Sequence, residues 1–288
     1  MSALVASRLG KRYGSNWALS ECTLDVPSGS VTALVGPNGA GKTTLLHLAV
    51  GLTRPSTGTV SVLGRSPIHD AAAVLPSVGF VAQDHPLYKS LSIADTFKLG
   101  RSLNKNWDDG FARARIDHLG LPLSKKVGQL SGGQQAQVAL TLALAKKPEL
   151  LLLDEPVASL DPLARREFMQ SLMEVVAERE LTVLLSSHII ADLERVCDHI
   201  VILARGRTQL VGAIDDVVAK HRLLTGPRSD SAAVARVHNV IRESHTERQT
   251  TLLVNANGHV YDSCWQLHEV DLEEIVLAYL GQRAELSA

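Results

Sequence analysis

Residues 36–44 form a glycine-rich loop that ends in a lysine and two hydroxyl side chains, Gly-Pro-Asn-Gly-Ala-Gly-Lys-Thr-Thr. Glycine lets a backbone turn tightly and bring its N–H groups up to phosphate oxygens. Lys42 is placed to reach the β- and γ-phosphates of a nucleotide, and the Thr43 hydroxyl can ligate Mg2+. The alternative is a glycine-rich turn that merely opens a helix. We expect a phosphate site made by Gly36, Asn38, Gly39, Gly41, Lys42, Thr43 and Thr44.

An acidic pair follows four consecutive leucines, Leu150–Leu153. This apolar run predicts a buried strand that delivers Asp154 and Glu155 to its end. Asp154 can hold Mg2+ through the water shell of the ion. Glu155 can accept a proton from, or orient, a water that attacks the γ-phosphate. The alternative is that the two carboxylates are only a polar strand end.

Two more segments could serve the same chemistry. Leu130-Ser131-Gly132-Gly133-Gln134 opens a long apolar helix, and a helix N-terminus with a serine and two glycines is a second anion site. Strand Thr182–Ser187 delivers His188 to the sheet edge where Glu155 lies, and a histidine can donate a hydrogen bond to a γ-phosphate oxygen. A lone histidine is more often structural, so the functional interpretation of His188 depends on its place after the acidic pair.

The phosphate loop needs a strand before it and a helix after it, and the sequence predicts both. Val31–Val35 is an apolar run typical of a buried strand, and residues 44–50 continue with helix formers. Further buried strands are predicted at Val78–Ala82, Leu150–Leu153, Leu181–Ser186 and His199–Leu203, with helices near 162–180 and 189–197. Alternating buried strands and helices predict an α/β fold with a parallel sheet.

The remaining segments predict an antiparallel and a helical part. Residues 3–30 and 59–64 alternate apolar and polar positions around turns, which indicates short antiparallel strands. Residues 91–147 are mostly helical, and their last helix, over 132–147, is stopped by Pro148.

The pattern changes near residues 215–230, where Gly226-Pro227-Arg228-Ser229-Asp230 interrupts it. We therefore expect a nucleotide-binding domain over residues 1–215, with a helical subdomain at about 84–147, and a small α+β extension over 216–288. In the extension, Thr250–Asn255 alternates like a strand, and a helix starts at Asp271 with an acidic cap and ends at Gly281.

Composition limits the class of protein. The 288 residues carry a formal net charge of −1, so no basic excess indicates nucleic acid or anionic lipid as a partner. The three cysteines are widely spaced, which suits a reduced intracellular protein. No apolar run approaches the roughly 18–20 residues that cross a bilayer, and no signal-peptide core is present. We expect a soluble protein whose membrane role, if it has one, requires a partner.

Taken together, the chain resembles the ATP-binding subunit of an ABC transporter over roughly residues 3–215. The motifs of that family occur in the family's order. They are Tyr13 as the adenine-stacking aromatic, Gly36–Thr44 as Walker A, Gln83 as the Q-loop glutamine, Leu130–Gln134 as the signature, Leu150–Glu155 as Walker B, Ser159-Leu160-Asp161 as the D-loop and His188 as the switch histidine.

The resemblance implies an ATPase that uses ATP and Mg2+ and works as a dimer, either of two copies or with a paralogous subunit. Ser131, Gly132, Gly133 and Gln134 of one subunit would act on the ATP held by the other, and the D-loop residues are Ser159 and Asp161. Gln83 would join Thr43 and Asp154 at the Mg2+ and assist Glu155 and His188 in catalysis. Tyr13 would stack on adenine, although a surface tyrosine near a turn needs no such function.

The resemblance also implies a transmembrane permease subunit as partner, with the chain in the cytoplasm, peripheral on the inner face of the membrane. Asp84-His85-Pro86-Leu87-Tyr88 follows Gln83 directly, so we expect the surface between Gln83 and the signature to receive a helix of that permease. Single cassettes with a short C-terminal extension are most similar to those of exporters, which predicts export. In one respect the chain departs from the family: Gln135-Ala136-Gln137 stand where basic residues are common.

Two other classes of protein share part of this pattern. A soluble ABC-type ATPase acting on ribosomes or DNA usually has paired cassettes or basic arms, whereas residues 215–288 hold seven basic and eleven acidic residues. A metabolic kinase or GTPase shares the phosphate loop but would not explain Leu130–Gln134 or His188. We therefore expect no nucleic-acid partner.

Overall fold

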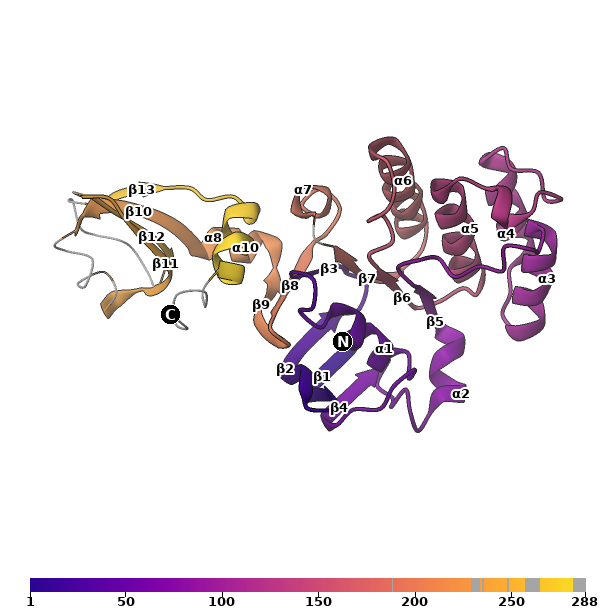
Figure 1. Cartoon of the computed structure of the whole chain (residues 1–288), viewed down its shortest axis with the longest axis horizontal. Coiled ribbons are helices and arrows are strands. Elements are labelled where there is room, and N and C mark those ends of the chain that lie inside the picture. Colours follow the sequence, from indigo (N-terminus) through magenta and orange to yellow (C-terminus); the bar gives the residue numbers. More distant parts are fainter. Residues whose placement is uncertain (188, 229–233, 235, 248, 257–264, 282–288) are drawn as a thin grey trace.

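A six-stranded sheet lies at the centre of the computed structural model, which describes residues 1–187, 189–228, 234, 236–247, 249–256 and 265–281 (Figure 1). Its order is β5-β6-β7-β3-β8-β9. The strands are β3 (Val31–Val35), β5 (Val78–Val81), β6 (Leu150–Asp154), β7 (Thr182–Ser187), β8 (His199–Ala204) and β9 (Arg207–Ala213). Neighbours from β5 to β8 are parallel, and β9 is antiparallel to β8. The expected α/β fold with a parallel sheet is confirmed, and β9 is an edge strand that we did not predict.

Both faces of this sheet are covered. Strands β3, β6 and β7 are buried at every position, as parallel strands with helices on both faces must be. Successive side chains of a strand point to opposite faces. Accordingly Ala33 and Val35 belong to one apolar cluster and Leu34 to another. This double burial fixes the end of β3, from which the phosphate loop begins.

A three-stranded antiparallel sheet, in the order β2-β1-β4, covers one side of the molecule. Its strands are β1 (Ser2–Tyr13), β2 (Asn16–Pro27) and β4 (Thr57–Val62). The expectation of antiparallel strands is confirmed, but their predicted shortness is wrong, because β1 and β2 each run for 12 residues. Register shifts interrupt the pairing of β1 with β2, and Arg8 and Glu21 there have φ of 46° and 51°. Such bulges break the apolar alternation without ending a strand.

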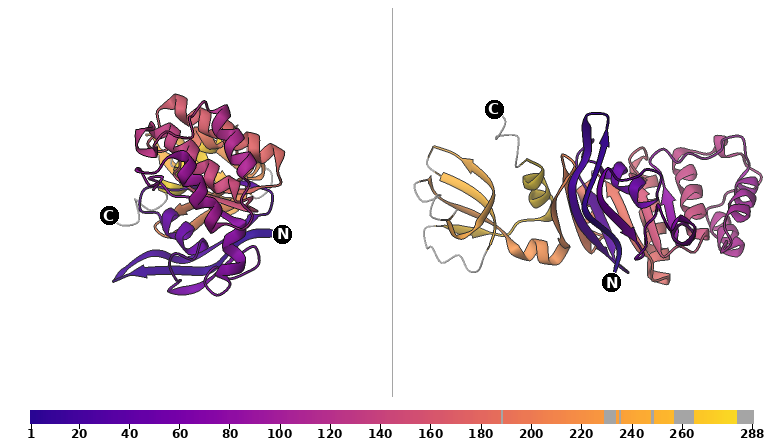
Figure 2. Two further views of the ribbon diagram at one scale, coloured as in Figure 1. Left: turned by 90° about the vertical axis from the view of Figure 1, so that its right-hand side faces the viewer. Right: turned by 90° about the horizontal axis from the view of Figure 1, so that it is seen from below.

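The helices gather mainly on the other side of the central sheet and at one end of the molecule (Figures 1 and 2). They are α1 (Lys42–Ala49), α2 (Ala71–Val74), α3 (Ile93–Leu103), α4 (Asp109–His118), α5 (Gly132–Ala145), α6 (Pro162–Glu178) and α7 (Ile190–Leu193), with short 3-10 turns at Leu75–Ser77 and Val127–Gln129. Helix α7 is much shorter than the helix expected over 189–197. In the described part of the chain, no helix is long and apolar enough to cross a membrane.

A four-stranded antiparallel sheet, in the order β11-β12-β10-β13, lies at the end opposite to α3 and α4 (Figure 2). This C-terminal part comprises α8 (Ile214–Lys220), β10 (His221–Pro227), β11 (Asn239–His245), β12 (Gln249–Asn255), β13 (Gln266–His268) and α10 (Leu272–Gly281). Helix α8 and strand β10 occupy the segment where the sequence pattern changes, and Gly226 and Pro227 lie within β10.

Helix α10 holds the C-terminal sheet against the rest of the molecule. It packs against β8, α7, α8 and β11. Asp271 caps it, accepting a hydrogen bond from the Glu274 backbone N–H at 2.7 Å, as the sequence predicts. Buried His221 faces Tyr279 of α10, with 3.0 Å between Nε2 and the phenolic oxygen. The extension therefore shares its core with the nucleotide-binding part instead of hanging from a linker.

Candidate nucleotide-binding site

The phosphate loop connects β3 to α1, and two of its glycines are required by close backbone neighbours. A Cβ on Gly36 would collide with the carbonyl oxygen of Leu203 in β8. Gly41 has φ +105°, and a Cβ there would lie 2.6 Å from the carbonyl oxygen of Ala18. The loop is therefore pressed between β8 and β2, and only glycine fits at these two points.

Helix α1 begins in a way that leaves its first turn available to an anion. Its N-cap is Gly41, and no side chain caps it by a hydrogen bond. The first N–H groups of a helix have no partners within the helix and carry partial positive charge. A phosphate placed in the loop would therefore meet both the loop backbone and this helix end.

Lys42 lies back along the loop and contacts the acidic end of β6. The side chain is only 5% exposed. Its Nζ donates to the carbonyl oxygens of Gly36 at 2.7 Å and Pro37 at 3.3 Å, and lies 3.0 Å from Oε1 of Glu155. The fold thus brings the loop lysine and the expected general base, which are far apart in the sequence, into one buried ion pair.

The acidic pair at the end of β6 is held by the neighbouring strand β7. The Ser186 hydroxyl donates to Oδ1 of Asp154 at 2.9 Å and accepts from the Glu155 backbone N–H at 2.8 Å. Glu155 has φ +43°, which is uncommon for a residue with a side chain. The backbone therefore turns sharply after Asp154, which directs Glu155 toward the loop.

A pocket of about 350 Å³ joins the loop to two of the other predicted residues. It is lined by Ala18, Gln83, Glu155 and loop residues 38–44. Asp154 is buried beneath the site and does not line it. Tyr13 is also outside the lining; it is half exposed at the end of β1, with Lys11 Nζ 5.1 Å from its ring centre. His188 lies outside the described residues.

The signature segment forms a second, separate helix start. Ser131 caps α5, since its hydroxyl accepts from the Gln134 N–H while its own N–H donates to Oε1 of Gln134, each at 3.2 Å. This is a complete capping box. Ser131, Gly133 and Gln134 line a pocket of about 270 Å³ together with Asp161 of the expected D-loop.

The expected D-loop residues lie at the start of α6, next to the signature. Asp161 caps α6, because its Oδ1 accepts from the N–H groups of Leu163 and Ala164 at 3.0 Å each. Ser159 is exposed. The structure therefore brings the signature and the D-loop together in one pocket, and the phosphate loop, Gln83 and Glu155 in another.

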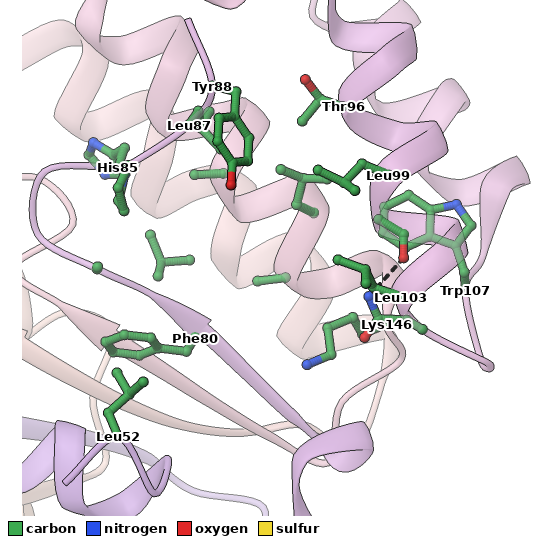
Figure 3. Close-up of a pocket in the computed structure, with 18 of the residues that line it drawn as sticks. Leu52, Phe80, His85, Leu87, Tyr88, Thr96, Leu99, Leu103, Trp107 and Lys146 are labelled. Carbon is green, nitrogen blue, oxygen red and sulfur yellow. Dashed lines mark hydrogen bonds between the residues drawn. The ribbon is translucent and has the colours of Figure 1, made fainter. Parts of the chain in front are cut away.

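Two features of this region escaped the sequence analysis. One is Arg115 of α4, whose guanidinium contacts Gln137 and Thr141 on α5. The other is an apolar cavity of about 510 Å³ between β5, α3 and α5. Figure 3 shows Leu99, Leu103 and Trp107 on the opposite side of this cavity from Phe80 and Leu52. Sequence periodicity could have suggested an apolar face on α3, but it could not show that this face lines an open cavity.

His85 lies where this cavity approaches the nucleotide pocket. The ring is 7% exposed, and within the described residues its Nε2 has no hydrogen-bond partner. Burial lowers the pKa of His85, while a hydrogen bond to the Pro156 backbone and the nearby Asp84 charge raise it. The imidazole is therefore held by the Pro156 backbone, and its Nε2 is buried beside the cavity.

A comparison with known families matches the part of the chain that holds this site. Residues 19–158 match the family model described as ABC transporter. These residues belong to an ABC-type cassette. The match ends before β7, but solved cassettes cover more of the chain: one described as an ATP-binding subunit of an ABC transporter aligns over 76% of this chain and 92% of its own, with a TM-score of 0.68 and 28% identity. The ABC-type P-loop fold expected from the sequence is confirmed.

Two curated relatives of the cassette are import proteins by name. A sulfate/thiosulfate import ATP-binding protein of Mycobacterium bovis is 39% identical over 75% of this chain and 62% of its own length. An Fe(3+) ions import ATP-binding protein of Mesorhizobium japonicum is 37% identical over 76% of this chain and 63% of its own. The chain thus matches less than two thirds of the length of these relatives. The names of both relatives describe import, whereas we expected export.

One solved cassette is similar in a dimeric state. It is described as a dimeric post-hydrolysis state bound to ADP and Pi, and it aligns over 73% of this chain and 98% of its own, with a TM-score of 0.65 and 26% identity.

Proposed function

We propose that this chain binds and hydrolyses ATP as the cassette subunit of an ABC transporter. The observation that carries the proposal is the meeting of Lys42, Gln83 and Glu155 around one pocket at the start of α1. The β- and γ-phosphates would take the place of Glu155 as partners of Lys42, because phosphate oxygens accept from the same ammonium group. Released from the ion pair, Glu155 would be available to a water near the γ-phosphate.

The residues present also fit a Mg2+ ion that accompanies ATP. Thr43 follows Lys42 at the pocket, Gln83 lines it, and the Asp154 carboxylate lies beneath it. These are oxygen donors, which a hard cation prefers, and Asp154 would act through water because it is buried. Bound Mg2+ would neutralise charge on the phosphates, while the protein residues position the nucleotide and the water.

The cassette would act as a dimer with two ATP molecules at its interface. The signature and the phosphate loop line separate pockets in one chain, so one nucleotide in the phosphate loop leaves the signature without an anion. A second copy turned to face the first would place each signature opposite the other copy's nucleotide. The dimeric cassette bound to ADP and Pi supports this arrangement by similarity.

Import is the transport direction that we now favour over export. The basis is the function named for the two curated relatives, since both are import proteins for inorganic ions. In such a system the cassette would lie in the cytoplasm against a membrane permease, and cargo would be chosen by the permease. Transport assays with the permease in vesicles test the direction, and ATP-driven movement of cargo away from the cassette side would contradict import.

The permease would dock at the apolar cavity of Figure 3. The cavity is lined by Ala82, next to Gln83 in the chain, and by His85, and its walls are mostly apolar. A short helix with an apolar face would fill it. Tyr88, 66% exposed at its rim, provides the test: Tyr88→Cys should crosslink to a cytoplasmic loop of the permease. Leu277→Cys on α10, also exposed, should not, and equal crosslinking at both positions would refute this docking site.

The catalytic proposal is tested by Glu155→Gln. The glutamine keeps the size of the side chain but cannot accept a proton, so turnover should fall by about 100- to 10,000-fold. ATP binding should remain, and the protein should accumulate as an ATP-bound dimer in size-exclusion chromatography with light scattering. Turnover like that of the unmodified protein would falsify the assignment of Glu155 as base.

A further inference from the structure

Helices α5 and α6 begin with the signature and the D-loop, and they are pressed together at their first turns. A Cβ on Gly133 would lie 2.8 Å from Cβ of Ala164, so the two helix starts touch without a side chain between them. Leu160 is within ordinary contact distance of Gly132. The signature and the D-loop therefore occupy fixed places relative to each other only as long as α5 and α6 stay in register.

A second contact between the same helices lies about one turn further along α5 and about two turns further along α6. Gln137 of α5 is 5% exposed, and its Nε2 donates to the Ser171 hydroxyl of α6 at 3.4 Å. Without a further partner, this single long hydrogen bond between two neutral groups would be a weak constraint on two helices. The partner is a guanidinium from a third helix.

Arg115 of α4 donates to both helices at this point. Its Nε donates to the Thr141 hydroxyl at 3.1 Å, and its Nη2 donates to Oε1 of Gln137 at 3.1 Å, both on α5. Its Nη1 donates to the Ser171 carbonyl oxygen on α6 at 3.4 Å. The planar guanidinium has donors in a fixed fork, so one side chain fixes the spacing of two helices in a way that lysine could not.

The neighbouring charges favour this bridge. Burial lowers the pKa of Arg115, and the charge of Glu174 on α6 raises it. A guanidinium stays protonated in proteins, so it supplies charged donors to otherwise neutral acceptors. The chain has Gln135-Ala136-Gln137 behind its signature, without a basic residue of its own at that point of α5.

We propose that Arg115 is a positioning residue that holds the signature and the D-loop as one rigid unit for the nucleotide of the opposite subunit. Ser131 and Asp161 line one pocket, so the place of Ser131 opposite a partner copy's γ-phosphate depends on how α5 sits on the start of α6 that Asp161 caps. Loss of the bridge lets α5 slide or rotate on α6, which misplaces the first turn of α5. This inference rests on the proposed ATP-bound dimer and adds to it a residue that touches no nucleotide.

The test uses the full chain in a Glu155→Gln background, where ATP-bound dimers persist. Arg115→Gln should raise the ATP concentration for half-maximal dimerisation by about tenfold, since a hydrogen-bonded charge is lost. Binding of a fluorescent ATP analogue to the monomer should change less than about twofold, because Arg115 is remote from the phosphate loop. A purely structural role would weaken both measurements together.

Three further variants sharpen this test. Arg115→Lys keeps the charge without the fork and should also weaken dimerisation; it serves as the principal variant if Arg115→Gln does not fold. Arg113→Gln removes an arginine of the same helix, which forms a 2.6 Å ion pair with Asp109. This control variant should not change dimerisation. Gln137→Arg added to Arg115→Gln returns a guanidinium to the α5–α6 contact and should restore dimerisation.

The outcomes separate this inference from the proposed function. If the Glu155→Gln protein does not dimerise with ATP, the proposed dimer fails and the inference falls with it. If that protein dimerises, and both Arg115 variants dimerise at the same ATP concentration as it does, only the role of Arg115 is refuted. A third outcome is that Gln137→Arg does not restore dimerisation and that Arg115→Gln lowers thermal stability. Arg115 would then contribute to general stability and not to positioning.

Discussion

The two helix starts that could bind phosphate, α1 and α5, differ in how their first turns are satisfied. Helix α1 has a glycine N-cap and no side-chain cap, and Lys42 with Glu155 supplies buried charge beside it. Helix α5 is closed by the Ser131–Gln134 capping box and has no acidic or basic residue in its first turn. In the proposed function the first helix start would hold the nucleotide, and the capping box makes the second rigid.

This difference suggests a division of labour between the two helix starts. A helix N-terminus alone contributes modest electrostatic energy, so strong phosphate binding needs a lysine and loop N–H groups in addition. The signature has no lysine, and Gly133 instead allows close packing on α6. We therefore expect changes at α1 to abolish nucleotide binding by the monomer, and changes at α5 to affect stability and dimerisation.

Among changes at the two helix starts, Lys42→Ala should have the largest effect. Removing a charged donor from the phosphates should lower turnover by about 100- to 1,000-fold, as loss of a preorganised donor does elsewhere. Binding of a fluorescent ATP analogue to the monomer should fall with it. Lys147→Ala is the matched control, because Lys147 is exposed and forms a 3.2 Å ion pair with Asp108. Unchanged nucleotide binding by Lys42→Ala would contradict the division between the two helix starts.

The next effect concerns the packing of the signature glycines. Gly133→Ala brings a methyl group to 2.8 Å from Cβ of Ala164 and should destabilise the fold by about 1–3 kcal/mol. Gly132→Ala meets only Leu160 at 3.7 Å and should leave the free energy of unfolding nearly unchanged. Urea unfolding measures both. Adding Ala164→Gly to Gly133→Ala removes the collision and should recover part of the loss; equal stability of the two single variants would refute this packing.

How much of this could be read from the sequence depends on the range of the interaction. The phosphate loop was predictable because its glycines, lysine and hydroxyls act within nine consecutive residues. Strands β3 and β6 were predictable because burial on both faces leaves uninterrupted apolar runs. The caps at Ser131 and Asp271 are likewise local, since each cap bonds a residue three positions later.

Features that depend on tertiary contact were not predictable in this way. Arg115 meets Gln137 only because α4 packs across α5, and neither residue carries a motif. The length of β1 and β2 was missed because bulges interrupt the alternation while the strands continue. The separation of the phosphate loop and the signature into two pockets follows from the packing of whole helices, which no short pattern encodes.

The smallest expected effect is that of Ser131→Ala on stability. The alanine removes the acceptor for the Gln134 N–H, and loss of such a cap costs about 1 kcal/mol of folding free energy. For a chain of this size the melting temperature should fall by a few degrees, roughly 2–4 °C. ATP binding by the monomer should stay as in the unmodified protein, because the phosphate loop is untouched. A drop in monomer ATP binding comparable to that of Lys42→Ala would mean that the two helix starts serve one nucleotide within a single chain, and the comparison between them would have to be abandoned.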